Sequence, residues 1–129
     1  GVHDFTATTG NTFKIALYTS DATLGAGTTA YSTSNEITNS SGTAYTAGGA
    51  TLTSVTPTSS STTALCDFSD VSYTSASFTA NGALIYNDSA SGDPAVCAIA
   101  FGADKTVTSG TFTIQFPAAA ATTAIIRLA

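Results

Sequence analysis

The feature of this sequence that most constrains its fold is an alternation of apolar and polar side chains every two residues. It runs from residue 12 to 19 and again from residue 110 to 116. A period of two sends successive side chains to opposite faces of an extended chain, so each segment predicts a half-buried β-strand. Pro117 cannot donate a ladder hydrogen bond, so the second strand should end there. The apolar faces consist of Phe13, Ile15 and Leu17 in the first segment and Phe112, Ile114 and Phe116 in the second.

Six further segments have the composition of short strands. Two of them, residues 83–86 and 96–101, are nearly continuous apolar runs, which is typical of central strands covered on both faces. Turn residues separate the segments and are expected to end them, at Thr56-Pro57-Thr58, Asn81-Gly82, residues 87–94 and Ser109-Gly110. The six segments are residues 50–56, 62–68, 71–79, 83–86, 96–101 and 122–128.

About seven or eight short strands with turns between them predict an all-β domain. We expect residues 1–129 to form a single antiparallel two-sheet sandwich of jelly-roll or immunoglobulin-like type. The polar segment from Asp21 to Gly49 is expected to be an ordered surface excursion, anchored by Tyr31, Ile37 and Tyr45.

The composition argues against several classes of protein. The chain is 43% hydrophobic and 9% aromatic, which disfavours intrinsic disorder. Its apolar runs fall far short of the ~20 residues that span a membrane. Three basic residues and a net charge of −5 argue against a nucleic-acid partner. One His and two Cys leave little for a metal site, and no cofactor is implied.

The candidate catalytic residues do not assemble into a recognisable site. His3-Asp4 is the one His next to an acid, but adjacent side chains rarely adopt catalytic geometry and no third group orients them. Asp67 with Asp70, and Asp88 with Asp93, could act in glycoside hydrolysis or hold Ca²⁺, although Asp is common in turns. We therefore expect no enzymatic activity.

Cys66 and Cys97 lie in two predicted strands of similar type, and two interpretations are open. They can be buried free thiols, which is the commonest state of such residues. Alternatively, they can form a disulfide that closes a loop of about 30 residues.

Tyrosines are the candidate contact residues. Tyr has an apolar body with a polar tip, which suits protein interfaces and stacking on sugar rings. A surface rich in Thr and Ser with little charge fits a protein that packs against copies of itself or a larger assembly. The candidates are Tyr18, Tyr31, Tyr45, Tyr73 and Tyr86.

Several stretches, in the same order along nearly the whole chain, resemble small virion structural proteins of tailed bacteriophages. The resemblance implies a structural protein on the outer surface of the virion, in contact with other virion proteins and copies of itself. A capsid decoration or cement protein bound to the major capsid protein is the leading expectation. The stretches are residues 1–5, 13–18, 44–49, 81–86, 101–104 and 110–116.

Other functions stay open. A tail, fibre or baseplate subunit is the alternative within the virion. A carbohydrate-binding module is the alternative from a different class, and a surface filament subunit is the third. A sugar module requires tyrosines aligned on an exposed face, whereas a filament subunit requires an unpaired strand edge.

Overall fold

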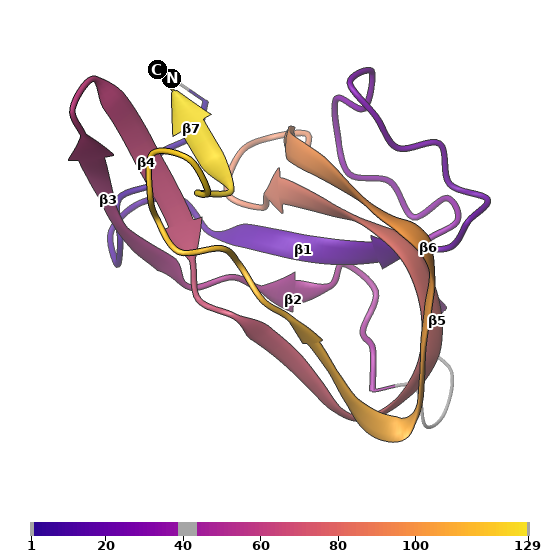
Figure 1. Ribbon diagram of the computed structural model, residues 1–129. Helices are drawn as coiled ribbons and strands as arrows, with labels where there is room; N and C mark the ends of the chain where they lie inside the picture. The colour runs from indigo at the N-terminus through magenta and orange to yellow at the C-terminus, as the bar shows by residue number, and fades with distance from the viewer. Residues whose placement is uncertain (1, 39–43, 129) are drawn as a thin grey trace.

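The computed structural model describes residues 2–38 and 44–128, and its strands form two antiparallel sheets (Figure 1). The larger sheet has the strand order β2-β1-β5-β6, and the smaller has the order β3-β4-β7. Within these ranges there is no helix, and the predicted all-β, two-sheet antiparallel sandwich is confirmed. The seven strands of the described residues are β1 (Phe13–Tyr18), β2 (Ala50–Thr51), β3 (Ser54–Ser60), β4 (Thr63–Phe68), β5 (Val71–Asn87), β6 (Ala95–Ile114) and β7 (Ile126–Leu128).

β1 lies inside the larger sheet, between β2 and the second half of β5. Its predicted apolar face of Phe13, Ile15 and Leu17 is fully buried in the main core. The opposite face does not meet solvent as a half-buried strand would, because the polar excursion covers it. This second core contains Ala16, Tyr18, Leu84 and Tyr86, with Ala22, Leu24 and Tyr31 of the excursion packed against it.

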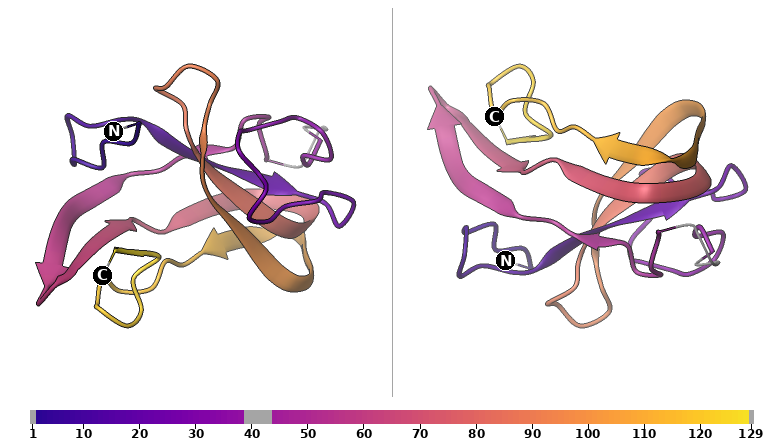
Figure 2. Two further views of the ribbon diagram at one scale, coloured as in Figure 1. Left: turned by 90° about the horizontal axis from the view of Figure 1, so that it is seen from above. Right: turned by 90° about the horizontal axis from the view of Figure 1, so that it is seen from below.

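β5 and β6 form one long hairpin that bends around the core, as both views in Figure 2 show. The predicted turns at Asn81-Gly82 and Ser109-Gly110 are wrong, since both pairs lie inside these strands. Gly82 is paired with Tyr18 on one side and Ala100 on the other, so the chain continues there. Irregularities in the register take up the bend instead, as β-bulges do. The predicted turn at residues 87–94 does connect the two strands.

The predicted strand over residues 50–56 is divided between the two sheets. β2 pairs with β1, whereas β3 starts at Ser54 and pairs with β4. The predicted turn at Pro57 is also wrong, because Pro57 lies within β3 at a shift in register between Val55 and Thr58. A residue without an N–H is tolerated there because β3 is an edge strand.

β6 is also an edge strand, although the apolar run at residues 96–101 predicted a central one. Its neighbour β5 meets the prediction for residues 83–86, which are buried between β1 and β6. By contrast, no residue of β6 is buried to the same degree. The apolar side chains of β6 therefore stay partly exposed along one side of the molecule.

Candidate functional site

The most concentrated polar cluster surrounds Glu36, a buried acid that links the excursion to β1. Glu36 exposes 7% of its surface. Its carboxylate accepts hydrogen bonds from the hydroxyls of Tyr31 at 2.7 Å and Tyr45 at 2.6 Å, and from the Gly48 N–H at 2.7 Å. The Tyr45 hydroxyl in turn accepts a hydrogen bond from the Leu17 N–H at 2.9 Å. Because a buried carboxylate is costly without partners, these donors hold the excursion against β1.

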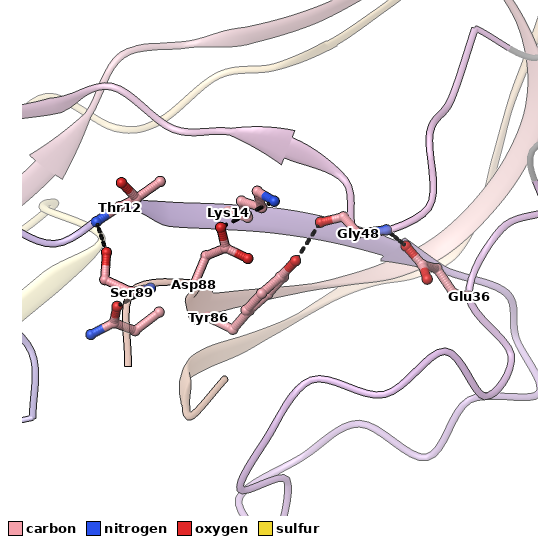
Figure 3. A network of polar contacts seen from close by, with 8 residues as sticks. Thr12, Lys14, Glu36, Gly48, Tyr86, Asp88 and Ser89 are labelled. Carbon is pink, nitrogen blue, oxygen red and sulfur yellow. Dashed lines mark hydrogen bonds and ion pairs between the residues drawn. The ribbon is translucent and has the colours of Figure 1, made fainter. Parts of the chain in front are cut away.

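Two further tyrosines fasten the same segment. The Tyr86 hydroxyl donates to the Gly48 carbonyl at 2.7 Å, next to the contact between Gly48 and Glu36 (Figure 3). The rings of Tyr31 and Tyr86 stack with their centroids 4.5 Å apart. The Tyr18 hydroxyl donates to the Ser32 carbonyl at 2.7 Å. These contacts confirm that the excursion is ordered in its described part.

Burial of the tyrosines corrects the expectation that they form a contact surface. Tyr31 alone is half-buried, and its ring is occupied by Tyr86. The other four have exposed fractions below a tenth, which leaves no ring face for a sugar or a neighbouring protein. Their exposed fractions are 2% for Tyr18, 1% for Tyr45, 8% for Tyr73 and 1% for Tyr86.

Three of the four candidate acids, Asp67, Asp70 and Asp88, are occupied by contacts within the fold. Asp67 accepts a hydrogen bond from the Phe68 N–H, and Asp70 accepts one from the Phe116 N–H. Asp88 pairs with Lys14 at 3.1 Å (Figure 3). In residues 2–38 and 44–128, no three His, Cys, Asp or Glu side chains lie close enough together to hold a metal ion.

The first residues of the chain are tied to the larger sheet by Asn87, which is fully buried. Its side-chain N–H groups donate to the Val2 carbonyl and to Asn11 Oδ1, both at 2.9 Å. Asp4 accepts two hydrogen bonds from Thr6 rather than contacts from His3, and these bonds lower the pKa of Asp4. The His3-Asp4 neighbour pair therefore serves local structure.

Cys66 and Cys97 are free thiols in different sheets, on β4 and β6. Burial raises the pKa of both thiols, which disfavours the reactive thiolate. Of the two interpretations of these cysteines, the structure therefore agrees with the free thiols and not with the disulfide.

Two surface features were not anticipated from the sequence. One is an apolar groove of about 540 Å³, lined by Ile99, Phe101 and Lys105 of β6, by residues 112–117 and by Ile125. The other is the β3–β4 arm, residues 54–63, which projects at the end of the molecule opposite the bend of the β5–β6 hairpin (Figures 1 and 2). Its residues 55–62 are all exposed and uncharged, and six of these eight residues carry hydroxyls.

Sequence reasoning missed Glu36 and Asn87, the two buried polar residues that organise the excursion and the chain start. One available signal was that Glu36 lies between Tyr31 and Tyr45 and precedes an uncharged stretch from residue 37 to 66. Asn87 carried no comparable signal, because its position before Asp88 and Ser89 is typical of a turn.

Comparisons of the chain with protein-family models, curated proteins and solved structures found no match. Among the described residues, there is no helix of the length and hydropathy needed to cross a membrane.

Proposed function

We propose that this protein is a non-enzymatic subunit of a tailed-bacteriophage virion that binds the outer surface of the head as a decoration or cement protein. The observation that carries the proposal is the uncharged β3–β4 arm. The resemblance of the ordered sequence stretches to phage virion proteins supplies the setting.

The arm has the properties of a surface that is completed by a neighbour. A hairpin exposed on both faces gains little from burial and is marginal by itself. Charged side chains are depleted in the cores of protein interfaces, and the arm has none. Its hydroxyls can donate and accept hydrogen bonds with a capsid surface. We infer that the arm contacts the major capsid protein.

Weak contacts of this kind are sufficient to hold a protein on a capsid lattice, because many copies bind side by side. Each arm offers a small area, but copies that also contact one another bind with a combined strength far above that of one arm. A decoration protein can therefore work without a catalytic group or a deep ligand pocket.

The test is reconstitution on particles from a phage that lacks this gene. Purified full chain is added, and bound protein is measured in separated head and tail fractions. The wild-type chain should saturate the heads. Thr58→Asp, in the exposed arm, should weaken binding about tenfold or more because it places a charge in the contact.

Thr108→Asp is the matched control, since Thr108 is equally exposed but lies on β6, in the other sheet. It should bind as the wild type does. Binding to the tail fraction instead would replace the decoration role with a tail role. An absence of particle binding together with saturable glycan binding would favour a carbohydrate-binding module.

A further inference from the structure

The apolar groove beside β6 is an open side of the main core. Six of the side chains that line it pack against that core and stay partly exposed. The groove volume of about 540 Å³ is typical of ligand sites, which measure roughly 300–1,000 Å³ and have mostly apolar walls. An apolar surface left open in this way indicates a binding site. The six side chains are Ile99, Phe101, Phe112, Ile114, Phe116 and Ile125.

Lys105 places a positive charge on the groove side of β6. It is paired with Ala80, which is fully buried in the main core, and residues paired across antiparallel strands point to the same face. The next residue, Thr106, bonds to Thr79 on the opposite, exposed face. Among the described residues that line the groove, Lys105 is the one with a charge, and it forms no ion pair with any of them or with the rest of the described chain. Its ammonium group is therefore available to an anion.

The acids near the groove give a bound anion a preferred orientation. Asp104 is engaged by Asn81, whose Nδ2 donates to it at 2.8 Å. Asp70 accepts a hydrogen bond from the Phe116 N–H at 2.9 Å, so its negative charge lies at the Phe116 end of the groove. An anionic head group is therefore attracted to Lys105 and repelled at Phe116.

The strand segments beside the groove do not offer a continuous edge to a peptide. The pairing of β6 with β5 is interrupted between Ala100 and Lys105, where Gly102 has a φ of 79°. Pro117, which also lines the groove, has no N–H to donate. An added strand needs a row of main-chain donors and acceptors, whereas an alkyl chain needs only apolar contact. The groove therefore suits an alkyl chain better than a peptide strand.

We propose that the groove binds a single-chain aliphatic carboxylate, with its alkyl chain against Phe101 and Phe112 and its carboxylate at Lys105 Nζ. The alkyl chain covers the open side of the main core and needs no polar partner. The carboxylate accepts hydrogen bonds from the ammonium group, which is a donor without a partner in the described chain. The inference does not depend on the proposed function and can be tested with the isolated chain.

The first experiment is calorimetric titration of the full chain with decanoate, at low ionic strength and below the concentration at which decanoate forms micelles. The wild-type chain should bind it saturably. Octanoate and hexanoate should bind progressively more weakly, by about threefold for each CH₂ removed, because each buried CH₂ contributes to the affinity. An absence of saturable binding, or an affinity that does not change with chain length, would overturn the proposal.

The second experiment tests the head group. Lys105→Met keeps an apolar stem but removes the charge, so it should weaken decanoate binding about three- to fivefold and leave the binding of decanol unchanged. Lys14→Met is the matched control, because Lys14 pairs with Asp88 and does not line the groove, and it should bind decanoate as the wild type does. If Lys105 only protects the edge of β6 from other strands, Lys105→Met will bind decanoate as tightly as the wild type, and the proposal is wrong.

The third experiment locates the bound ligand by nuclear magnetic resonance. Decanoate should shift the methyl signals of Ile99, Ile114 and Ile125, which line the groove, and should leave the signals of the polar pocket at residues 23–32 in place. The spectrum of each variant also shows whether it is folded. Shifts confined to residues outside the groove would contradict the assignment. Binding to vesicles of an anionic phospholipid without binding of decanoate would replace the single-chain ligand with a membrane surface.

Discussion

The hydroxyl of Tyr45 and the carboxylate of Glu36 lie 2.6 Å apart in a buried contact between the middle of the excursion and its last residues. Because the same hydroxyl accepts the Leu17 N–H, this one side chain connects the excursion to the central strand β1. A polar segment with few apolar residues of its own is thereby held in one conformation. The contact explains why the outer face of β1 is a second core rather than a solvent-facing surface.

Tyr45→Phe should lower the free energy of unfolding by about 2 kcal/mol, because it leaves the buried Leu17 N–H without this acceptor and removes one of the three donors to the Glu36 carboxylate. Urea denaturation measures the loss. Tyr73→Phe is the matched control, since the Tyr73 hydroxyl is also buried but lies near only the Ala50 backbone among the described residues, without a well-formed hydrogen bond. Equal losses in the two variants would contradict the role given to Tyr45.

The buried tyrosines predict a loss of stability at alkaline pH. Burial raises the pKa of Tyr31, Tyr45 and Tyr86, and it raises the pKa of Tyr73 to about 12. Unfolded tyrosines titrate near pH ~10. Above that pH the unfolded state loses protons that the folded state keeps, so the free energy of unfolding falls as the pH rises. Urea denaturation between about pH 8 and 12 measures the slope, and a constant stability over this range would contradict the prediction.

Gly49→Ala should destabilise the fold by about 3 kcal/mol or more. Gly49 has a φ of 79°, and a Cβ atom there would overlap the backbone carbonyl of Ile15. Gly25→Ala is the control, because a Cβ at Gly25 meets nothing within 4 Å. Thermal unfolding of both variants checks the difference. A Gly49→Ala variant as stable as the wild type would show that the excursion does not need this close approach to β1.

Reducing agent should leave the melting temperature unchanged, because Cys66 and Cys97 are free thiols on strands of different sheets. The measurement is a pair of melting curves with and without reductant on protein purified in air. A disulfide closing this loop would be worth about 3–4 kcal/mol in the chain-entropy model, so its loss would lower the melting temperature by several degrees. Such a drop would contradict the free-thiol state.

Local patterns predicted the strands better than they predicted the connections. The alternation around Phe13 and Ile15 placed β1 to within a residue at each end, because one face of that strand fills the core. Asn81-Gly82 resembled a hairpin turn, but whether such a pair turns depends on its neighbours in the sheet. Here Gly82 continues the strand where β1 and β6 approach closely, and a Cβ there would lie 2.9 Å from the Ile99 carbonyl oxygen.

The candidate contact residues could not be predicted in the same way. Tyr has an apolar ring and a hydroxyl, so Tyr45 and Tyr86 suit an interface or a core with a polar partner equally well. Whether these tyrosines lie in the core or at an interface depends on their polar partners, Glu36 and Gly48. Those partners reach the tyrosines only when the excursion packs against the larger sheet. The exposed edge of β6 is likewise a property of strand order, which a list of strands does not contain.

The most direct test of the central claim is the copy number of this chain in purified phage particles, measured by quantitative mass spectrometry against the major capsid protein. A decoration protein on the head lattice predicts hundreds of copies in each particle, in fixed proportion to the capsid protein. A dozen copies or fewer would contradict the decoration role and assign the chain to the tail or a vertex. Complete absence from particles would contradict the virion role itself.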